Sequence, residues 1–179
     1  MFAPHDKVVY PGHGVATIQR IIEKKIGSST VQFFELRFLN KDMTILIPTE
    51  NATAVGIRRL SSTEHIDGLF VLLAEPATEL NCDMTASNWN KRNKEYQCKL
   101  RTGSLREICV IYRDLRHLST YKKLSFGEKN LLQQTELLLI EEISLVTLIE
   151  HEKAAERLRS IFMSASLNLP SKHPVVAKL

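Results

Sequence analysis

The stretch VQFFELRFL, residues 31–39, alternates apolar and polar side chains along much of its length. Phe34, Leu36 and Phe38 fall on one face, and charged side chains fall on the other. A period of two is typical of a β-strand that buries one face and exposes the other to solvent. This segment therefore predicts a half-buried antiparallel strand, and with it a sheet in the N-terminal third of the chain.

Further β-rich segments flank this strand on both sides. They are rich in Val, Ile and Thr and cover residues 8–10, 15–26 and 43–47. Short breaks of turn-forming residues separate them: PGHG at 11–14, GSS at 27–29 and NKD at 40–42. Gly, Pro, Asn and Asp are the residues that most strongly favour turns. Four or five short strands in this region predict a small, strongly bent antiparallel sheet or barrel, close to the lower size limit for independent stability.

The hydrophobic period changes from strand-like to helical at residue 61. Three Ser-x-x-Glu sequences, at 61–64, 104–107 and 125–128, each precede an apolar run at helical spacing. This pattern is typical of a capping box at the start of a helix. Two further helices are expected over about 85–101 and 151–165.

These patterns together predict an α+β protein of two domains. We expect a small bent β domain over residues 1–60 and an all-α domain over residues 61–167. Residues 168–179 show no hydrophobic period, so we expect a flexible tail there.

The composition is that of an ordinary globular protein. The chain has 179 residues, of which 44% are hydrophobic and 25% are charged. No apolar run approaches the ~18 residues of a membrane helix, and no secretory signal precedes the first strand. The three cysteines show no C-x-x-C spacing, which favours free thiols in a reducing compartment. We therefore expect a cytoplasmic protein without a membrane partner.

Sequence signatures of an active site fail on inspection. His151-Glu152 begins like the zinc-protease pattern H-E-x-x-H, but Ala155 stands where the second histidine ligand is needed. Gly12 and Gly14 lie between two predicted strands, whereas a phosphate-binding loop leads into a helix. No Ser or Cys lies in a known nucleophile motif. We expect no enzymatic activity, no metal site and no cofactor.

Positive charge is concentrated in one part of the chain. The whole chain has a formal net charge of +4, but residues 84–132 carry eleven Lys and Arg against four Asp and Glu, a local charge of +7. A basic block of this kind is a candidate binding surface for a polyanion. A solvated helical surface would carry the same charge, and the charge alone does not separate these two interpretations.

The helix expected over residues 85–101 contains the single tryptophan of the chain, Trp89. The helix is too polar for a core element, and its cations are Lys91, Arg92, Lys94, Lys99 and Arg101. An aromatic ring among cations suits nucleic acid, because the cations neutralise phosphates while the ring stacks on or wedges beside an unstacked base. Alternatively, Trp89 anchors the helix to the core, and the long cationic side chains extend around it.

Several ordered motifs resemble the CarD/CdnL family of bacterial transcription regulators. The resemblance covers about residues 2–165 and is carried by VVYPGHGV (8–15), IPTEN (47–51), VGIR (55–58), NWNKR (88–92), YRDL (112–115) and LSFGEK (124–129). A similar N-terminal module occurs in the transcription-repair coupling factor, a large ATPase. The short chain and the helical half that contains Trp89 separate this sequence from that enzyme.

The resemblance implies a two-domain adaptor for RNA polymerase. The β domain would be Tudor-like and bind the polymerase β subunit, and the helical domain would contact promoter DNA. In the family, a tryptophan at the position of Trp89 wedges into the minor groove at the upstream edge of the transcription bubble. Such a wedge favours the open promoter complex over the closed one. The resemblance thus implies a cytoplasmic monomer associated with the nucleoid through polymerase.

The family positions map onto particular residues of this chain. Lys91, Arg92, Lys94 and Lys129 match basic positions that we assign to DNA phosphates. Lys24 matches one basic position of the polymerase contact, whereas Leu46 stands at the other. We therefore expect the strand edge to bind by backbone pairing with Leu46 as an apolar contact, over Met43, Thr44, Ile45, Leu46 and Ile47. The competing hypothesis is a protein–protein interaction module that binds polymerase or another partner without contacting DNA.

Overall fold

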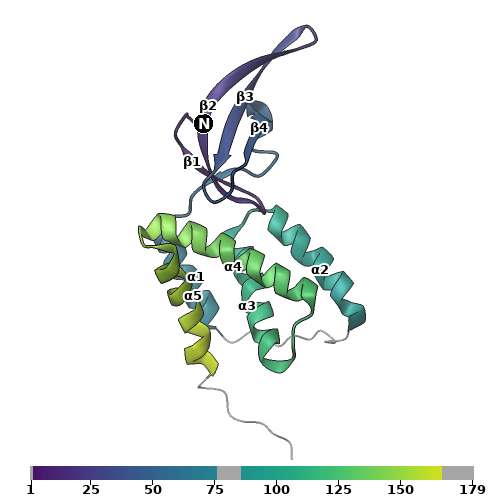
Figure 1. Ribbon diagram of the computed structural model, residues 1–179, viewed down its shortest axis with the longest axis vertical. Coiled ribbons are helices and arrows are strands. Elements are labelled where there is room, and N and C mark those ends of the chain that lie inside the picture. The colour runs from purple at the N-terminus through teal and green to yellow at the C-terminus, as the bar shows by residue number, and fades with distance from the viewer. Residues whose placement is uncertain (1, 76–85, 167–179) are drawn as a thin grey trace, which may run out of the picture.

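A computed structural model describes residues 2–75 and 86–166 of the chain. The expected tail at 168–179 lies outside these residues. Within them the chain forms an antiparallel sheet followed by a helical domain, as the sequence patterns predicted (Figure 1). The strands are β1 (Lys7–Tyr10), β2 (Gly14–Ile26), β3 (Ser29–Phe38), β4 (Thr44–Pro48) and β5 (Arg58–Arg59). The helices are α1 (Thr63–Ala74), α2 (Ala86–Arg101), α3 (Leu105–Tyr121), α4 (Phe126–Thr147) and α5 (His151–Ser166).

The sheet has the strand order β4-β3-β2-β1-β5, with every neighbouring pair antiparallel. Phe34, Leu36 and Phe38 of β3 are all buried, which confirms the face predicted from their alternation. Strands β2 and β3, which form a hairpin, are each longer than the other strands. A bulge in β2 lies between Ile18 and Arg20. The distal part of this hairpin forms a two-stranded arm that projects away from the helices (Figure 1).

Helix α4 is the element that holds the molecule together. It contacts α1, α3 and α5 and also reaches strand β2. Its residues 138–144 are buried without interruption, although a helix on a protein surface normally exposes one side. The burial on all sides follows from its position, because other helices cover one side and the β domain covers another.

The predicted helix caps are only partly confirmed. At α4 the capping box is complete, with the Ser125 hydroxyl accepting from the Glu128 N–H and the Glu128 carboxylate accepting from the Ser125 N–H. The predicted box at 61–64 is wrong by one residue, because the Ser62 hydroxyl accepts from the His65 N–H. At α3 the Ser104 side chain makes no capping hydrogen bond.

The two domains are joined by a partly buried ion pair between Arg58 of β5 and Glu142 of α4. The two guanidinium Nη atoms of Arg58 donate to the two carboxylate oxygens of Glu142, each at 2.7 Å. Arg58 Nε also donates to the Gly103 carbonyl oxygen at 2.7 Å, and the Ser61 N–H donates to Glu142 Oε1 at 2.9 Å. Glu142 is only 2% exposed, so the pair lies in a place where an unpaired charge would be costly.

The turn between β1 and β2 makes a second contact between the domains. The ion pair and this contact together form the joint between the two domains. Gly14 has a φ of +105°, and a Cβ built on it would lie within 2.1 Å of Glu141 Oε2. The ring of Pro11 packs closely against Gly56 and Gly103. Burial raises the pKa of Glu141, an effect opposed by the hydrogen bond from the Val15 backbone and by the charge of Lys41. The glycine at 14 is therefore explained by its positive φ together with the close approach of the Glu141 side chain.

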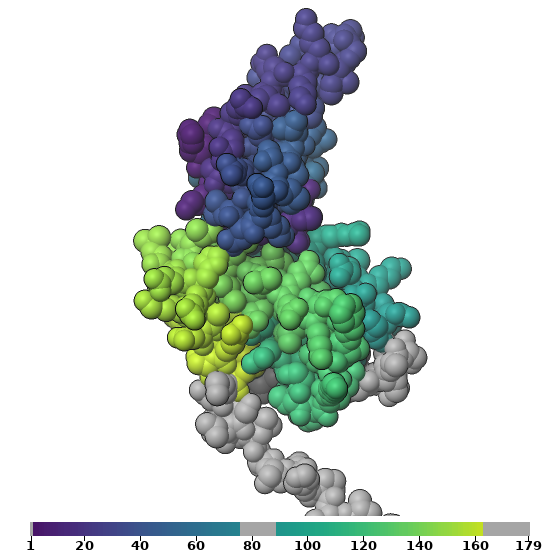
Figure 2. Space-filling view, viewed as in Figure 1, coloured from purple at the N-terminus to yellow at the C-terminus, as the bar shows by residue number. Residues whose placement is uncertain are grey.

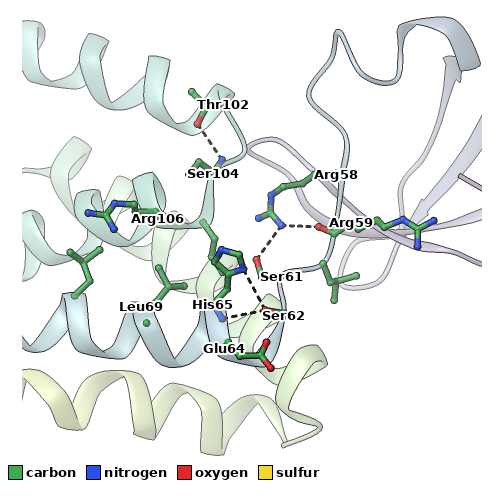
Figure 3. A pocket seen from close by; sticks show the side chains of 14 residues that line it. Arg58, Arg59, Ser61, Ser62, Glu64, His65, Leu69, Thr102, Ser104 and Arg106 are labelled. Carbon is green, nitrogen blue, oxygen red and sulfur yellow. Dashed lines mark hydrogen bonds between the residues drawn. The ribbon is translucent and has the colours of Figure 1, made fainter. Parts of the chain in front are cut away.

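A cavity of about 730 Å³ lies beside this joint, where the segment after β5 meets α1 and α3 (Figure 3). Its lining combines polar side chains, such as Ser62 and His65, with apolar ones, such as Leu69 and Leu105. Several of its polar atoms already bond to one another, including the Thr102 hydroxyl, which accepts from the Ser104 N–H at 3.2 Å (Figure 3). The cavity marks the seam between the domains.

We expect Arg58→Ala to lower the free energy of unfolding by about 3 kcal/mol, because the Glu142 carboxylate would stay buried without its ionic partner. Urea denaturation followed by circular dichroism measures the change. Arg20→Ala is the matched control, since it removes an arginine that pairs with Glu35 at 2.6 Å on the solvent-exposed face of the sheet. That change should cost much less, because this pair is exposed to solvent. Equal losses in the two variants would contradict a special role for the joint.

Candidate nucleic-acid interface

Helix α2 has an inward and an outward face. Arg92, Tyr96 and Leu100 point inward and are buried, whereas Lys91 and Lys94 are exposed. This agrees with the prediction of a polar surface helix that is held along one side. In the space-filling view α2 forms one flank of the helical domain, below the β domain (Figure 2).

Trp89 is half-buried and packs against the edge of the helical core. Its indole ring lies over Gly127 in the first turn of α4, where a Cβ on that glycine would be 3.0 Å from Trp89 Cζ2. The two interpretations of Trp89 from the sequence therefore each describe part of the ring. One part anchors α2 to α4, and the rest is open to solvent.

Glu128 connects α2, α4 and the segment between α3 and α4. Its carboxylate accepts from Arg92 Nη2 at 3.2 Å, from Lys122 Nζ at 3.0 Å and from the Ser125 N–H at 2.8 Å. The residue is only 1% exposed. Burial by itself raises the pKa of Glu128, but the hydrogen bonds from Ser125 and Lys122 outweigh it and keep the pKa below its ordinary value. Glu128 is thus a buried, ionised anchor.

The expected role of Arg92 as a phosphate contact does not fit its position in the structure. Its side chain is buried, at 6% exposure, and its guanidinium is paired with Glu128. The physical reason is helical spacing, because Arg92 lies three residues after Trp89 and therefore on the same inward face. A count of cations in the sequence cannot separate a buried arginine from an exposed one.

The other expected DNA contacts are on the surface. Lys91, Lys94 and Lys129 are all exposed, and the two helices that carry them meet at the contact between Trp89 and Gly127. The structure adds Phe126, which is 81% exposed at the first position of α4. Sequence reasoning missed this residue, although an apolar side chain directly after a capping serine, ahead of the inward stripe that begins at Leu131, is a usable signal.

The expected polymerase-binding strand is an edge of the sheet. Strand β4 pairs only with β3 in the described sheet, so its other side is unpaired. Thr44 and Leu46 are exposed, and Met43 and Ile45 are half-buried. Ile47 points into the sheet core, so only its backbone is available at the edge. Lys24 is exposed farther out on the arm, opposite Val31 and beyond the end of β4.

Metal binding, thiol reactivity and membrane crossing can each be checked against the described residues. No group of three or more His, Cys, Asp or Glu within 2–75 and 86–166 could hold a metal ion. Burial raises the pKa of the Cys109 thiol to about 12, so it stays protonated at neutral pH and is a poor nucleophile. In the same ranges no helix is both long and apolar enough to cross a membrane.

Both halves of this architecture match domains of one class of transcription regulator. Residues 2–61 match the CarD-like/TRCF RID domain, and residues 70–159 match the C-terminal domain of CarD. The chain belongs to the CarD family. It is also 27% identical over 146 residues to YdeB of Bacillus subtilis (strain 168), whose name describes it as a candidate transcription factor. The alignment covers 82% of this chain and 92% of that relative.

We expect Arg92→Ala to lower the free energy of unfolding by about 3 kcal/mol, because it removes one partner of a buried ion pair. Lys91→Ala is the control at the adjacent, exposed position, and it should change stability by less than about 0.5 kcal/mol. Lys and Arg have similar helix propensities, so the comparison isolates the ion pair. The measurement is urea denaturation of both variants, and coincident transitions would show that Arg92 is not a structural residue.

Proposed function

We propose that this CarD-family regulator binds the β subunit of RNA polymerase through its sheet and stabilises the open promoter complex through Trp89. The observation that carries the proposal is the state of Trp89, a ring that is anchored on one side, open to solvent on the other and carried by a helix whose outward face bears exposed lysines. A wedge between bases must be apolar, rigid and accessible, and cations must hold the phosphates around it.

The proposed DNA contacts are of two kinds. Lysines hold the phosphates and so position the protein, whereas aromatic rings wedge between bases. Lys91, Lys94 and Lys129 point to solvent and are available to phosphate oxygens, which carry no base sequence. Phe126 adds a second exposed aromatic ring next to Gly127. Trp89 binds an unstacked step better than an intact duplex, so it shifts the equilibrium between closed and open complexes. A differential affinity of about 1.4 kcal/mol shifts that equilibrium tenfold.

The supporting feature for polymerase is the free edge of β4. An unpaired strand edge can add a strand from a partner, with the backbone providing affinity and exposed side chains providing specificity. Leu46, at 38% exposure, supplies an apolar contact in place of the basic residue expected from the family. The ion pair between Arg58 and Glu142 then fixes the distance between this edge and Trp89.

A second candidate function is a protein-interaction module that does not touch DNA. The burial of part of the Trp89 ring in the helical domain favours it, because a purely structural tryptophan would be packed in the same way. In that case the basic surface around α2 would be a solvated face.

We expect Trp89→Ala to shorten the lifetime of open promoter complexes about tenfold, since base–aromatic stacking contributes about 1–3 kcal/mol. The lifetime is measured after addition of a competitor, with purified polymerase and a saturating amount of the regulator. The variant should still bind polymerase, because Trp89 lies on α2 in the helical domain whereas β4 is an edge of the sheet. An unchanged lifetime with a folded variant would favour the protein-interaction module.

Leu46→Glu is the matched variant for the other interface. It places a charge at the exposed edge of the sheet and should reduce polymerase binding without unfolding the β domain. Full polymerase binding by this variant would move the interface away from β4.

We expect Lys91→Ala, Lys94→Ala and Lys129→Ala each to weaken DNA binding by a similar factor on unrelated sequences. Each should reduce the slope of log K against log salt concentration by about one unit at most. The titration uses two duplexes of different sequence, both pre-opened over a short bubble. A variant that changes the preference between the duplexes and leaves the salt slope unchanged would indicate base reading and contradict phosphate positioning.

A further inference from the structure

We propose that Gly127 and Glu128, at the start of α4, are positioning residues that set the height and orientation of the Trp89 ring. The proposal rests on the proposed contact of Trp89 with DNA. Neither residue needs to touch the nucleic acid. Gly127 supplies the surface on which the ring lies, and Glu128 fixes the helix from which the ring extends.

The evidence for Gly127 is the space that its missing side chain leaves. A Cβ at this position would lie 3.0 Å from Cζ2, 3.4 Å from Cε2 and 3.4 Å from Nε1 of Trp89. These atoms all belong to the indole, so the ring rests directly on the backbone of the first turn of α4. Gly127 lies in the regular helix, where alanine is the better helix former. The presence of glycine at position 127 is therefore explained by the Trp89 ring that lies over it.

The evidence for Glu128 is the ion pair by which it holds α2. Arg92, one helical turn beyond Trp89, is held by the Glu128 carboxylate, and both side chains are almost fully buried. The same carboxylate is held by the Ser125 backbone and by Lys122, so its own position is fixed. With Arg92 tied to this point, α2 cannot rotate about its axis without breaking a buried ion pair. The rotation of α2 decides how far the ring extends.

Gly127→Ala separates a positioning role from a structural one. Because Trp89 is the single tryptophan of the chain, intrinsic fluorescence of the free protein reports on this ring alone. We expect Gly127→Ala to shift the emission maximum, to increase quenching by acrylamide at least twofold and to shorten the open-complex lifetime at least threefold. The far-ultraviolet circular dichroism should stay that of the wild type.

Gly68→Ala is the matched control. Gly68 is also a helical glycine, in α1, but a Cβ there would meet nothing within 4 Å. It carries the same change in helix propensity without a contact to Trp89. Its fluorescence, quenching and open-complex lifetime should equal those of the wild type.

Glu128→Gln tests the second half of the proposal. The change keeps the shape of the side chain and removes the charge that holds Arg92, so we expect Trp89 quenching to rise at least twofold and the open-complex lifetime to fall at least threefold. Since this variant leaves a buried arginine unpaired, the double variant Glu128→Gln, Arg92→Gln is measured beside it. The double variant carries no unpaired buried charge from this pair and should show the same gain in quenching.

The outcomes distinguish this proposal from the function on which it rests. If Trp89→Ala shortens the open-complex lifetime while Gly127→Ala and the Glu128 variants match the wild type, the positioning role is overturned and the DNA contact stands. If Gly127→Ala alters the fluorescence but even Trp89→Ala leaves the lifetime unchanged, the DNA contact fails, and positioning for DNA fails with it. A shift in fluorescence together with a proportionate loss of lifetime supports both.

Discussion

The structure depends on one buried carboxylate that must not be left without a partner. Glu142 lies inside the molecule at the place where α4 meets the β domain, and both Nη atoms of Arg58 donate hydrogen bonds to it. An ion in such a place is tolerated only when its geometry is well satisfied. The sheet and the helices are therefore held in one relative orientation, although each has its own hydrophobic core.

A similar arrangement recurs on a smaller scale around α2. This helix is too polar to be held by apolar burial alone, and a buried ion pair with Glu128 supplements the packing of Tyr96 and Leu100. The result is a surface helix that is fixed on its inward face and carries exposed lysines on its outward face. A basic surface can be rigid in this way without becoming part of the core.

Much of the fold could be predicted from local sequence patterns. The alternation in residues 31–39 identified a half-buried strand, and the serine and glutamate at 125 and 128 identified the start of α4. The failures at Arg58, Glu142 and Arg92 share a physical cause, since each depends on contacts distant in the chain. Arg58 and Glu142 are ordinary charged residues in the sequence, and the sequence assigns Arg92 to DNA phosphates because its partner Glu128 belongs to another helix.

The close approach of α4 to the turn before β2 has a consequence for how this protein can vary between species. Gly14 has no room for a side chain because Glu141 occupies the space above it. Position 14 should stay glycine whatever residue position 141 carries, because its φ of +105° also disfavours a side chain, whereas a change in either of Arg58 and Glu142 calls for a change in the other. Arg58 and Glu142 should therefore be inherited as a linked pair. Lineages that lose one partner should pass through a compensating replacement in the second, rather than drift at each site independently.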